Sequence, residues 1–197
     1  MTCATLDELR AKVFSRVDPA YAAKYLHEVP DLPTVPNRAA YLADKAKGRN
    51  VLDLGCTGAI SQGIRAASAT YHGVDKDPGG DWTTVDLDRA PEQLPRFADV
   101  DLVIASELLE HLSNPGRCLD ALRAAYPETP VYVTVPHAGA YQVRGSQENV
   151  NADHVAWYSY TTLATLLGRS RYRIAEARWY HGQPHTAEGL IVLARPA

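Results

Sequence analysis

From residue 50 onward, short apolar runs alternate with segments whose apolar residues recur at helical spacing. The runs at 51–54, 71–74, 101–105 and 131–135 are typical of buried strands, and a weaker one lies at 82–85. Helices are expected near Ser61, from Glu107 with a restart after Pro115, and over 161–167. This alternation predicts a mostly parallel sheet with helices on both faces.

The pattern ends with two apolar runs, 172–179 and 190–195, separated by a polar loop. That loop is too short for a parallel crossover, so the last strand should be antiparallel. The expected fold is α/β: a Rossmann-like, doubly wound, mostly parallel seven-stranded sheet with an antiparallel last strand.

The first quarter of the chain has a different pattern. Residues 5–29 have helical spacing, prolines interrupt the pattern between 30 and 36, and a further helix is expected over 38–47. We therefore expect a single domain, 1–197, in which residues 1–45 form a helical N-terminal cover and residues 50–197 form the core. A length of 197 residues suits one domain of this kind.

Charge and cysteine content narrow the function classes. The net charge is −3 and no block of Lys or Arg occurs, so tight binding to nucleic acid or an anionic membrane lacks electrostatic support. The three cysteines are scattered and form no zinc spacing, which favours a reducing cytoplasm. No apolar segment approaches the roughly 20 residues that a membrane span needs.

Candidate ligand-binding residues follow the predicted strands. In an open α/β sheet, ligands bind beyond the carboxyl ends of the strands. Gly55 lies in the turn after the first strand, Asp75 ends the second strand 20 residues later, and Asp86 and Leu87 follow the third. An acid at that distance from a glycine turn can accept hydrogen bonds from both hydroxyls of a ribose.

These residues resemble the ordered motifs of class I S-adenosylmethionine-dependent methyltransferases. The similarity is carried by Val51–Cys56, Gly73–Asp75, Val85–Leu87 and Asp101–Leu112. In that family the glycine turn holds the methionine part of the cofactor, the next acid the ribose, and the third pair the adenine. The resemblance implies a cofactor site formed by Asp53, Gly55, Cys56, Thr57, Gly58, Asp75, Lys76, Asp86, Leu87 and Ser106.

The glycine turn departs from the family's pattern. Thr57 and Ala59 stand where the family has glycines, and Gly58 is shifted by one position. A β-carbon there can narrow the pocket, so a non-catalytic module that binds the cofactor or a partner stays as an alternative. A dinucleotide dehydrogenase is disfavoured, since the turn lacks the third glycine that packs the helix near a pyrophosphate.

A group of acids and histidines should lie near the transferred methyl. Glu107, Glu110 and His111 would share one face of the expected helix, and His154 follows the fifth strand. His111 and His154 are the candidate catalytic bases. Alternatively, the four residues hold a divalent metal, in a pattern that resembles the metal sites of small-RNA 2′-O-methyltransferases and quinone-ring O-methyltransferases. A purely structural role for Glu110 and His111 is the third interpretation.

The expected activity is transfer of a methyl group from S-adenosylmethionine to an oxygen or nitrogen of a small metabolite or glycan. A small-molecule substrate is expected, with no membrane and no nucleic acid as partner. A divalent metal is a possible second cofactor.

Overall fold

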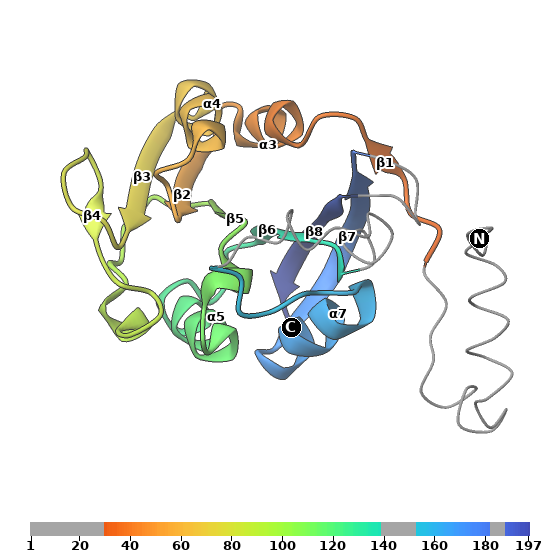
Figure 1. Ribbon diagram of the computed structural model, residues 1–197. Helices are drawn as coiled ribbons and strands as arrows, with labels where there is room; N and C mark the ends of the chain where they lie inside the picture. Colours follow the sequence, from red (N-terminus) through yellow and green to blue (C-terminus); the bar gives the residue numbers. More distant parts are fainter. Residues whose placement is uncertain (1–29, 139–152, 182–187) are drawn as a thin grey trace, which may run out of the picture. The chain divides into compact units, whose positions relative to one another are not determined.

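The computed structural model describes residues 30–138, 153–181 and 188–197 (Figure 1). The chain divides into two compact units, Met1–Pro30 and Asp31–Ala197. The helices expected within 5–29 lie outside the described residues, so the N-terminal cover stays a prediction. Everything that follows concerns the second unit.

An eight-stranded sheet forms the centre of this unit. In chain order its strands are β1 (Thr34–Val35), β2 (Asn50–Leu54), β3 (Thr70–Asp75), β4 (Thr83–Thr84), β5 (Leu102–Ser106), β6 (Val131–Pro136), β7 (Tyr172–Tyr180) and β8 (Gly189–Pro196). Across the sheet they are ordered β1-β7-β8-β6-β5-β2-β3-β4. Only β8 runs against its neighbours, β6 and β7. The mostly parallel sheet with an antiparallel last strand is therefore confirmed.

The sheet has eight strands rather than the expected seven. The additional strand is β1, within the proline-containing stretch that was expected to be only a break between helices. It lies at the edge and pairs in parallel with β7, through hydrogen bonds from Trp179 N to Pro33 O and from His181 N to Val35 O. An edge strand tolerates flanking prolines because one of its sides needs no backbone donors.

Helices cover both faces of the sheet (Figure 1). Helices α3 (Arg38–Ala46) and α4 (Ala59–Ala67) pack on one face, where Leu42 and Ile64 join a buried cluster with Val51 and Ile104. Helices α5 (Pro115–Ala125) and α7 (Tyr160–Arg169) pack on the other, against residues that include the neighbouring strand position Leu52. Side chains of a strand alternate between faces, so each apolar run supplies both layers of the core.

The segment after β5 differs from the expected helix. Instead of a helix from Glu107, a short 3-10 turn, η2 (Leu109–His111), precedes α5; another, η1 (Pro91–Gln93), lies between β4 and β5. Glu107 itself has a left-handed backbone with φ of 53°. Helix α5 begins only where Asn114 caps it by accepting a hydrogen bond from Arg117 N. Glu107 therefore does not share a helix face with Glu110 and His111.

Among the helices within 30–138, 153–181 and 188–197, none is both long enough and apolar enough to cross a bilayer.

Candidate functional site

A cleft of about 700 Å³ lies at the carboxyl ends of β2, β3 and β5. Its volume is in the range of sites that bind small molecules and nucleotide-sized cofactors. Its wall includes eight of the residues that the sequence indicated as candidates: Gly55, Thr57, Asp75, Lys76, Asp86, Leu87, Glu107 and His111. The fold therefore brings the ends of three strands together around one space, as expected for a sheet of this type.

The turn between β2 and α4 forms one wall of the cleft. Gly55 has φ of 76°, a conformation that favours glycine, and its N–H donates to Val74 O at 2.9 Å. A β-carbon at Gly55 would lie 3.4 Å from the side chain of Leu108, which also lines the cleft. Gly58 caps α4 with an extended backbone and has open space around it. Of these two glycines, Gly55 is the one whose backbone conformation favours glycine.

Asp75 lies at the end of β3 with 6% of its surface exposed. One carboxylate oxygen accepts a hydrogen bond from the Thr57 hydroxyl at 3.1 Å, and the other accepts from Asp77 N at 3.0 Å. Farther along the wall, Asp86 Oδ1 accepts from Asp88 N and Arg89 N, while Leu87 is buried in the core beside it. The cleft wall therefore offers a ligand the carboxylate of Asp86 next to the apolar side chain of Leu87.

The other four candidate cofactor residues are not among the residues that line the cleft. All four belong to the described part of the chain: Asp53, Cys56, Gly58 and Ser106. Ser106 contacts the Thr134 hydroxyl at 3.0 Å. Asp53 is 1% exposed and accepts a hydrogen bond from Tyr71 Oη at 2.8 Å, on the sheet face covered by α4. Burial raises the pKa of Asp53 to about 6. A direct role of these four residues in cofactor binding stays a prediction.

Glu107 is held at the edge of the cleft by a network that the sequence did not indicate. Arg38 Nη1 lies 2.6 Å from Glu107 Oε1, and the hydroxyls of Thr134 and Tyr180 donate to the same oxygen at 2.9 and 3.1 Å. The Glu107 N–H also donates to Thr134 O at 3.0 Å. These partners come from α3, β6 and β7, which explains how the left-handed backbone of Glu107 is maintained.

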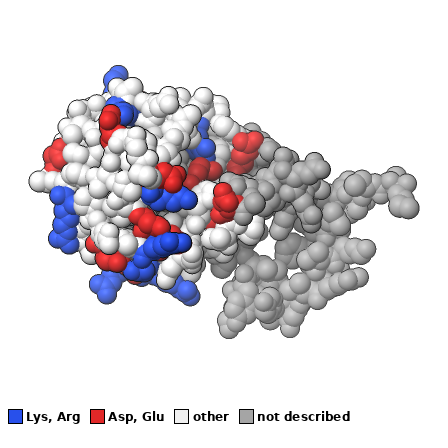
Figure 2. Space-filling model, turned by 60° about the vertical axis from the view of Figure 1, so that its left-hand side comes forward, with Lys and Arg blue, Asp and Glu red and all other residues white. Residues whose placement is uncertain are grey.

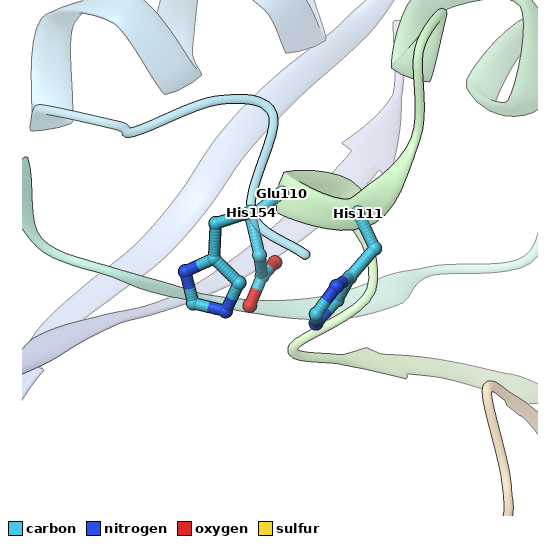
Figure 3. A group of neighbouring side chains, drawn as sticks. All are labelled: Glu110, His111 and His154. Carbon is cyan, nitrogen blue, oxygen red and sulfur yellow. The ribbon is translucent and has the colours of Figure 1, made fainter. Parts of the chain in front are cut away.

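Glu110, His111 and His154 form a cluster (Figure 3), of which His111 lines the cleft. Each offers one ligand atom, and these atoms lie within 4.8 Å of one another. The two imidazoles meet edge to face, with centroids 4.7 Å apart, and His111 Nδ1 lies 3.2 Å from Asp153 O. Figure 3 shows the Glu110 carboxylate between the two rings.

The Glu110 carboxylate is completely buried, and among the described residues neither of its oxygens has a hydrogen-bond partner. Burial, and then the negative charge of Glu107, raise the pKa of Glu110 to about 8. The pKa of His154 is lowered by burial and by the neighbouring His111. The sequence grouped these three residues with Glu107, but the structure directs the Glu107 carboxylate to Arg38 instead.

Several solved methyltransferase structures have this fold. The 1,6-didemethyltoxoflavin-N1-methyltransferase of Burkholderia thailandensis is 14% identical, with 100% of this chain and 92% of that chain covered and a TM-score of 0.61. The magnesium protoporphyrin IX methyltransferase of Synechocystis PCC 6803 is 15% identical, with 100% and 90% covered and a TM-score of 0.58. Both contain S-adenosylhomocysteine.

A small RNA methyltransferase is 16% identical, with 81% of this chain but only 25% of that chain covered, and a TM-score of 0.62. No curated protein matches the sequence. A family model described as "Methyltransferase domain" matches residues 22–176, which is most of the chain. The chain therefore belongs to the methyltransferase domain family and is a class I S-adenosylmethionine-dependent methyltransferase.

Proposed function

We propose that the cleft binds S-adenosylmethionine along the ends of β2, β3 and β4, and that the methyl acceptor enters beside Glu107 and His111. The observation that carries this proposal is the convergence of the Gly55 turn, Asp75 and Asp86 on one space of about 700 Å³. The cofactor supplies a methyl group on a sulfonium. The protein contributes binding, orientation and a proton acceptor.

The charge of the cleft supports a small acceptor without phosphate groups. Its described wall carries six carboxylates but only two basic side chains: Asp75, Asp77, Asp86, Asp88, Glu107 and Asp153 against Lys76 and Arg89. Such a wall attracts a sulfonium and repels a polyanion. On the face drawn in Figure 2, Lys and Arg are interspersed with Asp and Glu, and no continuous basic surface is visible. We propose an oxygen or nitrogen of a small metabolite or glycan as acceptor.

His111 and His154 are the proposed proton acceptors. His111 lines the cleft, and His154 lies next to it. Burial and the neighbouring His111 lower the pKa of His154, which favours the neutral imidazole, the state that can accept a proton from a hydroxyl or an amine.

Calorimetric titration with S-adenosylmethionine and S-adenosylhomocysteine tests the cofactor site. Binding in the micromolar range, about −8 kcal/mol, is expected. Asp75→Ala should weaken it strongly, and Asp81→Ala, an exposed control with a side chain 88% accessible, should not. Absence of binding to folded wild-type protein would contradict the proposed site, and binding without methyl transfer to any acceptor would favour a non-catalytic module.

Methyl transfer to matched acceptors tests the substrate class. Hydroxyl- and amine-containing metabolites and oligosaccharides are compared with their phosphorylated forms and with oligonucleotides, using a radiolabelled methyl group. Preferred turnover of the uncharged members supports the proposal. Preference for phosphorylated acceptors or RNA would refute it.

We also propose a divalent cation at Glu110, His111 and His154, as an alternative to the role of the two histidines as bases. The buried, unpartnered carboxylate of Glu110 between two imidazoles supports it, because such a donor set suits Mn²⁺ and similar ions better than Mg²⁺. Titration with Mn²⁺, followed by electron paramagnetic resonance, should reveal one bound ion per chain, and Glu110→Gln should abolish it. Equal binding to both proteins would refute this site.

A cytoplasmic location is proposed as well. Both cysteines in the described part of the chain, Cys56 and Cys118, are buried free thiols, which suits a reducing compartment. Fractionation of cells that produce the protein tests it, and recovery outside the cytoplasm would refute it.

A further inference from the structure

The main chain holds Thr57 and Asp75 close together. The N–H groups of Gly55 and Cys56 both donate to Val74 O, which joins the turn after β2 to the residue that precedes Asp75. On the other side, Val85 N donates to Asp75 O at 2.8 Å. These backbone hydrogen bonds hold the main chain of the turn next to Asp75, so that the Thr57 hydroxyl can reach the Asp75 carboxylate.

The Asp75 carboxylate is held from two sides. Oδ2 accepts from the Thr57 hydroxyl at 3.1 Å, and Oδ1 accepts from Asp77 N at 3.0 Å. An ionised carboxylate offers about four lone-pair positions, so about two stay available, one on each oxygen. Asp75 is only 6% exposed, which limits how far water can replace a missing donor.

This arrangement matches a vicinal diol, which presents two hydroxyl donors next to one another. A carboxylate can accept both hydroxyls, one on each oxygen, when each oxygen directs a free lone pair into the cleft. Without the Thr57 hydroxyl, Oδ2 loses the donor that fixes the rotation of the carboxylate group. The Asp77 N–H would then be the one donor that the structure shows on that side chain.

We propose that Thr57 is a positioning residue for the cofactor: its hydroxyl orients Asp75 so that one free lone pair on each oxygen meets the two hydroxyls of the ribose. The proposal rests on the proposed function of the cleft. It gives a role to the residue at which the turn departs from the glycine pattern, since threonine supplies a hydroxyl that glycine lacks.

Two variants at one position separate the hydroxyl from the volume of the side chain. Thr57→Val keeps the shape and removes the donor, whereas Thr57→Ser keeps the donor. Each is titrated calorimetrically with S-adenosylhomocysteine and with its 2′-deoxy analogue, and thermal unfolding confirms that the variants are folded. Thr57→Val is expected to bind S-adenosylhomocysteine about tenfold more weakly, and Thr57→Ser within about threefold of wild type.

The deoxy analogue gives a readout that a purely structural role would not change. Removal of the 2′-hydroxyl should weaken binding strongly in wild type and in Thr57→Ser, but much less in Thr57→Val, where Asp75 is no longer oriented. Equal weakening of both ligands by Thr57→Val, or no weakening, would overturn the proposal while leaving the cofactor site intact. Failure of wild-type protein to bind S-adenosylhomocysteine would overturn both.

Discussion

Replacement of the buried Asp53 by Asn should change how stability depends on pH. Burial raises the pKa of Asp53 from 3.8 to about 6, and hydrogen bonds from Ser61 and Tyr71 offset the effect only in part. Between these two pH values the folded protein binds more protons than the unfolded chain, so the free energy of unfolding falls as pH rises. Above pH 6 the ionised carboxylate costs about 3 kcal/mol, at about 1.4 kcal/mol per pH unit.

Asp53→Asn removes the charge and keeps the shape, and the Tyr71 hydroxyl can still donate to the amide oxygen. At pH 8 the variant is expected to be more stable than wild type by about 1–3 kcal/mol, because the buried charge is gone. Near pH 4.5 Asp53 is neutral in the folded protein but still mostly ionised in the unfolded chain, so the difference should shrink to about a third of its value at pH 8. Urea denaturation followed by circular dichroism measures both values.

The control is Asp81→Asn, at an exposed carboxylate whose replacement should change stability by no more than about 0.5 kcal/mol. A stability difference between wild type and Asp53→Asn that is the same at pH 4.5 and pH 8 would refute the reasoning. So would a variant that is less stable than wild type at pH 8.

Three further predictions concern stability and are measured by urea denaturation. Gly55→Ala should lower the free energy of unfolding by about 1–2 kcal/mol, because φ of Gly55 is 76°. Gly58→Ser, at φ of −80°, should leave stability unchanged or raise it slightly, and an equally stable Gly55→Ala variant would contradict the argument from φ. Arg38→Leu should lower the free energy of unfolding by about 1–3 kcal/mol, because Glu107 loses its ion-pair partner, and Arg38→Lys should recover part of that stability. Unchanged stability of Arg38→Leu would show that the ion pair does not stabilise the fold. Asn114→Ala should cost about 1 kcal/mol by uncapping α5, and an unchanged midpoint would argue against the cap.

The strands of the sheet centre could be predicted from the sequence to within a residue or two at most ends. Strands that are buried on both faces consist mostly of apolar residues, so Asn50–Leu54 and Val131–Pro136 stand out from their polar surroundings even though they include Asp53 and Thr134. Strand Thr34–Val35 could not be predicted, because two residues carry no periodicity and their pairing depends on β7, far away in the sequence.

The segment after β5 misled the sequence interpretation for a physical reason. Leu108, Leu109 and Leu112 have a spacing that suits a helix, but Glu107 is held by tertiary contacts, among them Thr134, which lies 27 residues farther along the chain. Such tertiary contacts override local propensity.

Parts of the candidate site could be predicted and parts could not. Gly55 and Asp75 converge because they end neighbouring parallel strands, which is a consequence of topology alone. Arg38 and Tyr180 reach Glu107 only because of where α3 and β7 lie, and no motif in the sequence indicates this.

The position of β8 has a consequence for the order of folding. Strand β8 is the last strand of the sheet in chain order, yet it lies between β6 and β7, and β1 is joined to the sheet through β7. During synthesis, β1 and β7 have no sheet to join until Gly189–Pro196 has left the ribosome. Tyr180, which reaches Glu107 from β7, is added to the site at this same late stage, so a nascent chain that stops before β8 cannot assemble the complete cleft edge.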